Sequence, residues 1–560
     1  MALIYPNTYS LAVSNLGYQL IYRLLNAFDH VVCERFVYPQ DNEPFRSLES
    51  SRPLSDFPLV FGSISFEHDF PRLAAMLVAG GVEPYAVDRG AVITAGNPLV
   101  VLGGVGVFMN PEPLALFADV MVIGEAEPVL FPLLEELTDQ SNRHEALHRI
   151  GTTLTGCYVP SMYSFTYGED GVVQHIHVAQ GFPARVRKVV LEQTTVASHS
   201  ELLSPEAELS MYMTELGRGC SRSCRFCAAG FIYRPPRLWS SDAVLAGLEQ
   251  RPEGVQRVGL LGMEMSDAAT LDRIAVYLQD NDCSLSFSSL RADRISKPLL
   301  KLLSASSLKS VAIAPDGASQ RLREVINKGL SEKDLLEAAV SLVAAGIYTL
   351  KLYVMIGLPT ETEADLDELI ALIHTLREQV LPLGQARGRV CEIILSVNSF
   401  VPKPWTPFQY VSFGGQEADR AMEQRNSRGA VNSLKKKIKY LKTNLAQIAN
   451  LHMKVDRPDR VLSQAVFSRA DRRIAPVLLD IGTGRRSFKQ AMSAHGLSSW
   501  QYAVRPRRAD ELFCWQVVDH GIADTFLYHE FEKAMAGRLT SSCDTSVCRR
   551  CGVCNETAVA

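Results

Sequence analysis

Long apolar segments are missing from this chain of 560 residues. No run of about 18 uninterrupted apolar residues occurs, so we expect no segment that spans a bilayer and no membrane partner. Residues 1–6 lack a basic region ahead of an apolar stretch, so we expect no signal peptide. The formal net charge is only −4, which gives no global electrostatic reason to expect nucleic-acid or membrane binding.

The pattern of cysteines typical of exported proteins is also missing. Seven of the 12 cysteines lie in two tight clusters, and the others are scattered singly. In a chain without an export signal, this pattern indicates metal binding in a reducing compartment rather than disulfides. We therefore expect a cytoplasmic protein, with several domains because 560 residues are too many for one core.

The first cysteine cluster comprises Cys220, Cys224 and Cys227, with Phe226 directly before the third thiol. Thiolates are the usual ligands of iron–sulfur clusters, and three of them hold three corners of a cubane. The fourth iron then keeps an open coordination site, which is typical of catalysis. Zinc is the alternative, but zinc usually takes four ligands as two pairs, and this trio has no fourth cysteine nearby.

The N-terminal region alternates apolar runs with helical stretches. The apolar runs include residues 59–65, 99–104 and 120–125. Continuous apolar strands separated by helices predict a parallel, doubly wound sheet. Ligands bind such sheets at the carboxyl ends of the strands, where Ser63, Gly103 and Gly104 are the candidate cofactor-binding residues.

The central region alternates strand and helix six times. The predicted strands are residues 211–216, 258–261, 285–288, 310–313, 349–355 and 392–397. Six βα units predict an open, partial (β/α)6 barrel of the TIM type, in which chemistry gathers at the carboxyl ends of the strands. The first cysteine cluster follows the first of these strands. The predicted divisions are a doubly wound domain (1–185), a linker (186–210), a core (211–410) and an α-rich C-terminal domain (411–560).

These residues resemble a known superfamily. The cysteine loop resembles the signature of radical S-adenosylmethionine (SAM) proteins. Residues 218–235, 314–316, 325–329, 356–362 and 400–408 are similar to a family of such proteins that carries an N-terminal cobalamin-binding domain and is related to methylthiotransferases. The resemblance implies that Cys220, Cys224 and Cys227 hold a [4Fe–4S] cluster whose free iron is chelated by SAM. An electron from a flavodoxin-type or ferredoxin-type reductant would then cleave SAM to a 5′-deoxyadenosyl radical.

The resemblance also suggests residues that contact SAM. The candidates are Phe226, Gly262, Glu264, Ser288, Arg291, Asp316 and Gly357. Gly262-Met263-Glu264 is similar to the Gly-Gly-Glu that meets the methionine amino group, although Glu264 could be an ordinary surface acid. Arg291 could fork onto the SAM carboxylate, and a salt bridge at the rim is its alternative role.

Cobalamin is a second implied cofactor, with one departure from the usual pattern. The loop after the first strand, residues 6–10, contains no Asp-x-His-x-x-Gly, the motif that supplies a lower axial histidine. Some relatives bind cobalamin without this ligand. The alternative is a degenerate domain that only packs against the core, since a fold alone does not establish a site.

The second cysteine cluster lies near the C-terminus and comprises Cys543, Cys548, Cys551 and Cys554. Consecutive spacings of two residues favour an auxiliary iron–sulfur cluster, and structural zinc is the alternative. Residues 434–442 form a basic helix that is either a solvated surface or a contact for RNA phosphates. Residues 468–473 combine three arginines with an aspartate, which predicts an ion-pair network that locks the last domain to the barrel.

Three functions follow as hypotheses. The first is a radical SAM enzyme that functionalises an unactivated carbon, by cobalamin-dependent methylation. The second is methylthiolation or sulfur insertion on RNA or protein, with the terminal cysteines as a sulfur source. The third is a non-catalytic iron–sulfur binding or assembly protein.

Overall fold

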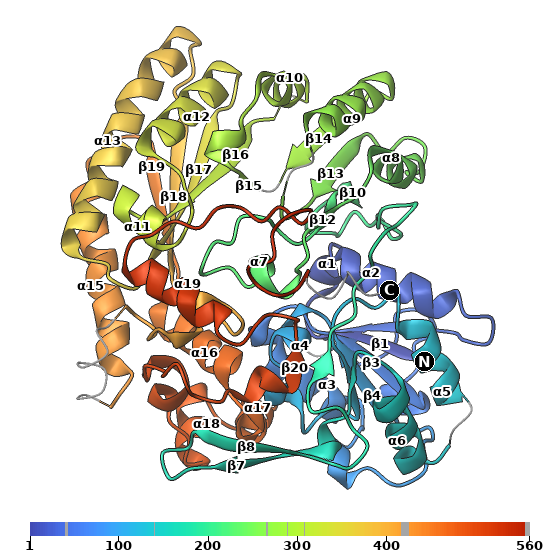
Figure 1. Cartoon of the computed structure of the whole chain (residues 1–560). Helices are drawn as coiled ribbons and strands as arrows, with labels where there is room; N and C mark the ends of the chain where they lie inside the picture. The colour runs from blue at the N-terminus through green and yellow to red at the C-terminus, as the bar shows by residue number, and fades with distance from the viewer. Residues whose placement is uncertain are drawn as a thin grey trace.

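The computed structural model describes residues 1–39, 43–138, 141–264, 267–287, 289–306, 308–415 and 425–554. Figure 1 shows a blue N-terminal α/β domain below a green and yellow α/β core, with the orange and red C-terminal segments running alongside both. Across the described residues, no helix combines the length and the apolar character needed to cross a bilayer.

The N-terminal domain is built on a six-stranded sheet with the order β2-β1-β3-β4-β5-β6. Its strands are β1 Ala2–Tyr5, β2 Glu34–Val37, β3 Leu59–Ser63, β4 Leu99–Gly103, β5 Val120–Val122 and β6 Cys157–Tyr158. All pairings are parallel except that of β6 with β5. The order 2-1-3-4-5 is that of a doubly wound fold, so the predicted parallel sheet is confirmed.

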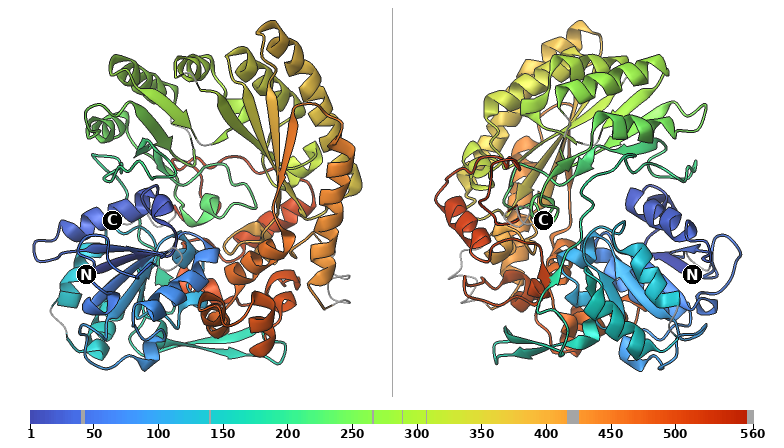
Figure 2. Two further views of the ribbon diagram at one scale, coloured as in Figure 1. Left: turned by 180° about the vertical axis from the view of Figure 1, so that it is seen from behind. Right: turned by 45° about the vertical axis from the view of Figure 1, so that its right-hand side comes forward.

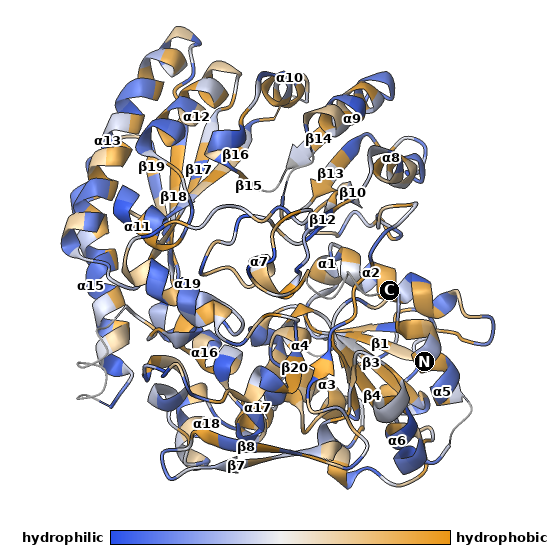
Figure 3. Ribbon diagram, in the orientation of Figure 1, coloured by the Kyte–Doolittle hydropathy of each residue, from blue (hydrophilic) through white to orange (hydrophobic). Residues whose placement is uncertain are grey.

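Both faces of this sheet are covered, as the continuous apolar strands require. Alternate residues of a strand point to opposite faces, so Leu3 packs with α2 (Leu16–Asn26), whereas Ile4 packs with α3 (Phe70–Ala79). The helices α5 (Leu130–Thr138) and α6 (Arg143–Thr153) lie on the same face as α2. Figure 3 shows the apolar strands of the sheet between helices with hydrophilic outer faces.

The core contains a strand at each of the six predicted positions and one more, at residues 289–290. They are β10 Tyr212–Glu215, β13 Arg257–Leu261, β14 Ser284–Phe287, β15 Ser289–Leu290, β16 Ser310–Asp316, β17 Thr349–Ile356 and β18 Glu392–Ser399. These parallel strands form two sheets, β10-β13-β14 and β15-β16-β17-β18-β19, with helices α8 (Ser241–Glu249), α9 (Ala268–Asp280), α10 (Lys297–Ala305), α12 (Glu332–Ala344) and α13 (Glu363–Ala386) between them in sequence. Closure into one partial barrel stays a prediction.

The core sheet continues beyond the boundary predicted at residue 410. Strand β19 (Leu451–Val455) pairs in parallel with β18, and α15 (Arg428–Leu445) connects them. The region after residue 410 is therefore rich in helix, but its first part completes the core. The segment predicted as a linker likewise contains β9 (Val186–Arg187), which pairs with β20 (Val518–Asp519).

Further helices follow in the C-terminal region, and those at residues 458–469 and 475–482 contact the N-terminal domain. These further helices are α16 (Pro458–Arg469), α17 (Ala475–Gly482), α18 (Phe488–Ala494) and α19 (Phe526–Met535). Helix α17 packs on α3, and both views of Figure 2 place the orange helices beside the blue domain. The hairpin of β7 (Tyr163–Tyr167) and β8 (Val173–Val178) extends along this junction.

The predicted ion-pair network around residues 468–473 is present, and it binds the N-terminal domain in addition to the core. Arg472 pairs with the buried Glu112 at 2.8 Å, and Asn110 donates to the Ser468 and Ala470 carbonyls. The network therefore ties the C-terminal helices to the N-terminal domain as well as to the core, which Arg469 reaches through the carbonyls of residues 409 and 411. Sequence alone gave no signal for Glu112 as the partner, because it lies 360 residues earlier.

Candidate functional site

The first cysteine loop follows β10 and is fixed by hydrogen bonds from neighbouring strand ends. The Ser221 amide and hydroxyl donate to the two Glu264 carboxylate oxygens at 2.8 and 2.6 Å. The Arg225 amide donates to the Ile326 carbonyl, and Arg234 donates to the Ser223 hydroxyl. Ser223 has a left-handed backbone (φ 57°), so the loop turns sharply between the first two cysteines.

The three thiols of the loop converge. Desolvation is the main cause that raises the pKa of all three, to about 12 for Cys224, and the charges of Cys220 and Cys227 raise the Cys224 pKa further. Within the described residues, no three His, Cys, Asp or Glu side chains lie close enough to share one metal ion. A cubane spaces its thiolates more widely, because each thiolate binds a different iron. Three thiols on one loop are the donor set that three corners of a cubane take.

Several of the predicted SAM-binding residues lie around this loop. Glu264 accepts the hydrogen bonds from Ser221 in the loop. Asp316 pairs with Lys328 at 2.5 Å, and both charges lie near Cys224. Arg291 pairs with Asp293 at 2.8 Å and donates to the Lys328 carbonyl, which matches its alternative as a rim salt bridge.

Phe226, Gly357 and Ser288 complete that set. Phe226 is half-buried against the central core. Gly357 (φ 78°) is approached by Leu434 of α15, and its amide donates to Glu361. Ser288 lies outside the described residues. The structure thus groups Glu264 and Asp316 near the cysteines, whereas the space beside Gly357 is filled by the chain itself.

A cavity of about 540 Å³ lies between the two α/β parts. Its floor is the carboxyl edge of the N-terminal sheet, where Ser63, Gly103 and Gly104 line it. Their role as cofactor-binding residues stays a prediction. Its opposite wall comes from the ends of β10 and β13 and includes Gly262. Gly104 has φ 100°, and a Cβ there would lie 2.5 Å from the Ile64 carbonyl oxygen, so this turn requires glycine.

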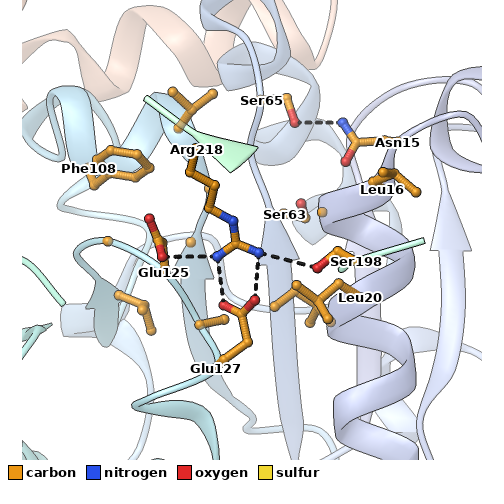
Figure 4. Close-up of a pocket in the computed structure, with 18 of the residues that line it drawn as sticks. Asn15, Leu16, Leu20, Ser63, Ser65, Phe108, Glu125, Glu127, Ser198 and Arg218 are labelled. Atoms are coloured by element: carbon orange, nitrogen blue, oxygen red, sulfur yellow. Dashed lines mark hydrogen bonds and ion pairs between the residues drawn. The ribbon is translucent and has the colours of Figure 1, made fainter. Parts of the chain in front are cut away.

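A buried arginine joins the two walls of this cavity. The Arg218 guanidinium contacts Glu127 at 2.6 Å and Glu125 at 3.0 Å, and its Nε donates to Glu215 at 3.0 Å. Figure 4 shows the guanidinium lying between Glu125, Glu127 and Ser198 inside the cavity. Arg218 stands two residues before Cys220, so the ion pair connects the N-terminal domain to the root of the cysteine loop. Sequence reasoning missed this arginine, since a single charge beside a cysteine motif has no distinctive spacing.

The ion pair predicts a pH dependence. Burial alone would raise the Glu125 pKa, but the hydrogen bond from Arg237 and the charge of Arg218 outweigh it, so the pKa is lowered. A carboxyl whose folded-state pKa is depressed contributes stability at neutral pH and loses it as the pH falls through that pKa. We expect urea midpoints of the metal-free chain to decrease below about pH 5, and Glu125→Gln to be less stable at pH 7 with a shallower decrease. Parallel curves for the two chains would contradict this assignment.

Two family models match the chain. The first is described as radical SAM proteins, N-terminal, and covers residues 17–160. The second is the radical SAM superfamily and covers residues 214–373, which contain the first cysteine cluster. The α/β core and its cysteine loop are therefore a radical SAM domain. The chain belongs to the radical SAM superfamily and is an enzyme, and membership implies a [4Fe–4S] cluster, SAM and a reductant.

Three curated relatives have similar sequences. An uncharacterized protein of Methanocaldococcus jannaschii is 25% identical over 486 residues, which cover 85% of this chain and 90% of the relative. An uncharacterized methyltransferase of Pyrococcus horikoshii is 22% identical over 304 residues, with coverages of 52% and 61%. A ribosomal protein uS12 methylthiotransferase of Chlorobium phaeobacteroides is 26% identical over 193 residues, with coverages of 32% and 44%.

Solved structures give more distant likenesses. The cobalamin-dependent S-adenosylmethionine radical enzyme OxsB aligns with a TM-score of 0.40 at 14% identity, covering 66% of this chain and 51% of that chain. Coproporphyrinogen III oxidase of Escherichia coli, a radical SAM enzyme, aligns with a TM-score of 0.28 at 14% identity, with coverages of 40% and 51%. This chain therefore spans about half the length of each solved chain.

Proposed function

We propose that this radical SAM enzyme methylates an unactivated carbon with the help of cobalamin bound in the cavity between the N-terminal domain and the core. Cys220, Cys224 and Cys227 would hold the [4Fe–4S] cluster. One electron delivered to SAM breaks a carbon–sulfur bond and gives methionine and a 5′-deoxyadenosyl radical, which abstracts hydrogen from the substrate. A second SAM would serve as the methyl source.

The observation that carries this proposal is the position of the cavity. It lies at the carboxyl edge of a doubly wound sheet, which is where such sheets bind ligands, and it faces the end of the strand that leads into the cysteine loop. Its volume falls within the range of about 300–1,000 Å³ that is common for cofactor sites. A cofactor there would therefore stand beside the proposed radical source.

The lining of the cavity fits a large, mainly apolar ring system with polar edges. Leu16, Leu20 and Phe108 provide apolar surface, while Ser63 and Asn15 provide hydrogen-bonding groups. Among the described residues that line the cavity there is no histidine, in agreement with the missing Asp-x-His-x-x-Gly motif. Cobalamin would therefore be held without an imidazole from the cavity wall.

Anaerobic reconstitution tests the proposal directly. The chain is loaded with iron, sulfide and cobalamin, its visible spectrum is recorded, and products are measured after addition of SAM and a low-potential reductant. We expect retained cobalamin, together with both 5′-deoxyadenosine and S-adenosylhomocysteine. Formation of 5′-deoxyadenosine without S-adenosylhomocysteine, in a sample that does not retain cobalamin, would remove the methylation proposal.

A larger side chain in the cavity should prevent cobalamin binding without preventing SAM cleavage. A Cβ on Gly103 meets only Val122 at 3.7 Å, so Gly103→Leu can be accommodated and places its side chain toward the cavity. We expect this variant to lose most of the bound cobalamin while it still forms 5′-deoxyadenosine. Ala91→Leu, at an exposed position of the same domain, is the control and should retain cobalamin like the unaltered chain. Equal cobalamin content in both variants would place cobalamin elsewhere.

Sulfur insertion is the second candidate function. The amide of Cys543 donates to the Ser221 carbonyl at 2.7 Å, so the terminal cysteines lie next to the first cysteine loop. One relative is a methylthiotransferase, which supports the same reaction class. Loss of sulfur from the terminal cluster during turnover would support it, whereas unchanged turnover after Cys548→Ala and Cys551→Ala would count against it. The third hypothesis, a non-catalytic assembly protein, has no support from the matches to enzyme domains.

RNA and protein are the two proposed classes of substrate. Helix α15 does not favour RNA, because it uses its apolar face, Leu434, Ile438 and Leu441, to pack on the core. Lys437 pairs with Glu361 at 2.5 Å, and Lys435 pairs with Asp459. Lys437 therefore binds a buried carboxylate of the core, whereas the other lysines of the run, Lys435, Lys436, Lys439 and Lys442, lie on an exposed helix face.

A further inference from the structure

The C-terminal tail, residues 538–554, lies directly against the first cysteine loop. The Cys543 amide donates to the Ser221 carbonyl at 2.7 Å, and the Arg222 guanidinium reaches the Ser542 hydroxyl at 3.4 Å. Two cysteine clusters that are more than 300 residues apart in sequence thus meet through main-chain contact. In Figure 1 the red tail crosses beside the green segment that carries α7 (Ala229–Ile232).

Arg225, between the second and third cysteines of the first loop, anchors the tail. Its side chain is fully buried, and its Nη2 donates to the Arg538 carbonyl at 2.5 Å and to the Thr540 hydroxyl at 3.3 Å. The same nitrogen lies 3.5 Å from the Glu530 carboxylate of α19. A buried guanidinium needs such partners, so the tail and α19 complete the environment of this loop residue.

The Asn327 side chain forms hydrogen bonds with both the tail and the first cysteine loop. Its Nδ2 donates to the Thr540 carbonyl at 3.1 Å, and its Oδ1 accepts from the Thr540 amide at 2.9 Å. The same Nδ2 lies 3.3 Å from the carbonyls of Arg222 and Ser223 in the first loop. One amide side chain therefore links the cysteine loop to the tail.

The four thiols of the tail are drawn together by the chain around them. Cys543 and Cys548 share a hydrogen bond, and their charges and that of Cys551 act on one another, as do those of Cys554, Cys551 and Cys548. Arg550 donates from Nε to the Cys548 sulfur at 3.3 Å and from Nη2 to the Ser541 carbonyl at 2.8 Å. The Cys551 carbonyl accepts from the Ala523 amide. The thiols therefore gather on one folded segment.

The tail has little else to order it. No helix or strand is assigned to its described residues, 538–554. Leu539 and Val547 are 56% and 75% exposed, and among the described tail residues only Cys551 and Val553 are buried, so apolar burial orders the last residues of the tail and little of the rest. Fixing each residue of such a segment costs about 1–2 kcal/mol of conformational entropy. Metal binding by thiolates supplies folding free energy in small segments that lack a core.

We propose that Cys543, Cys548, Cys551 and Cys554 bind a metal centre through their thiolates, and that this centre orders the tail so that it braces the first cysteine loop. The inference rests on the proposed function only in taking Cys220, Cys224 and Cys227 as ligands of the catalytic cluster. Among the described residues no three of these thiols lie close enough to share one ion, so an iron–sulfur centre, in which each thiolate binds a different iron, fits them better than zinc. Metal analysis tests this choice. In this role the tail positions the first cysteine loop and takes no part in the chemistry itself.

The test compares the full chain with the Cys548→Ser/Cys551→Ser double variant after anaerobic loading with iron and sulfide or with zinc. We expect the unaltered chain to bind metal beyond the first cluster and to resist trypsin at Arg538, Arg549 and Arg550. The double variant should lose that metal and be cut in the tail. Its 5′-deoxyadenosine formation should fall about tenfold, as for outer partners of metal ligands. Cys283→Ser, in neither cluster, is the control and should match the unaltered chain.

Asn327→Gly tests the brace without removing a thiol. Asn327 has φ 55°, a conformation that glycine adopts freely, so the loop should keep its backbone while losing the hydrogen bonds of this side chain. We expect the tail to keep its metal and 5′-deoxyadenosine formation to fall. Absence of tail-bound metal, or trypsin resistance of the double variant equal to that of the unaltered chain, would overturn the proposed centre. Unchanged activity of Asn327→Gly would overturn the brace. A chain that binds tail metal but never cleaves SAM would instead refute the proposed function.

Discussion

A Cys224→Ser chain yields no 5′-deoxyadenosine from SAM above the uncatalysed background. Serine offers a hydroxyl where a thiolate must bind iron, so the cubane would lose one of its three protein ligands. The cluster then cannot present a stable open corner to SAM, and the reductive cleavage stops. The measurement is product formation by anaerobically loaded protein with excess low-potential reductant, together with the electron paramagnetic resonance signal of the reduced cluster.

The control for this loss is Cys283→Ser, because Cys283 is a half-exposed thiol directly before β14, outside both clusters. It should keep full activity. Persistent SAM cleavage by Cys224→Ser would refute the assignment of the three-cysteine cluster. Deleting the chain from Cys543 onward is a poorer test, because the Cys543 amide contacts Ser221 and deletion would disturb the first loop as well.

An Arg218→Met chain should lose about 3 kcal/mol of its free energy of unfolding, the effect expected when one partner of a buried ion pair is removed. The Arg218 side chain is 9% exposed and Glu125 is 6% exposed, so the carboxylates would stay in the cavity wall without their shared cation. Methionine preserves most of the volume, which limits the contribution of a new void. Urea-induced unfolding of the metal-free chain measures the change.

The matched control is Arg508→Met, since Arg508 and its partner Asp510 are 71% and 78% exposed. Exposed pairs contribute about 0–1 kcal/mol, so this chain should unfold almost as the unaltered one does. Arg218→Lys should be intermediate, because lysine keeps the charge but cannot fork onto Glu127 and Glu125 together. If Arg218→Met unfolds like Arg508→Met, the ion pair does not join the two parts of the molecule.

The parallel strands could be predicted from sequence because each is a short apolar run between helical segments. The runs at 59–65 and 349–355, for example, coincide with β3 and β17. The run at 451–455, Leu-His-Met-Lys-Val, alternates apolar and polar residues, and it forms the edge strand β19 beside β18. Its position in the core sheet depends on pairing with β18, which the sequence of that segment does not encode.

The residues of the candidate site could be predicted only where they form a motif with a fixed spacing or follow a general rule for the fold. Cys220, Cys224 and Cys227 form such a motif, and glycines at strand ends such as Gly103 follow from the rule for parallel sheets. The cavity joins residues from Asn15 to Met263, so its shape depends on how two domains pack. Asn327 likewise acquires its contacts from a tail segment that begins more than 200 residues later.

The pairing of β9 with β20 bears on when the molecule becomes complete during its synthesis. Arg187 and Asp519, which pair across these strands, are separated by 332 residues. The N-terminal domain therefore emerges from the ribosome with the outer surface of α3 and the β9 edge uncovered, long before α17 and β20 exist. Closing a contact over so long a separation is slow. This surface is therefore covered only after the C-terminal helices have been made.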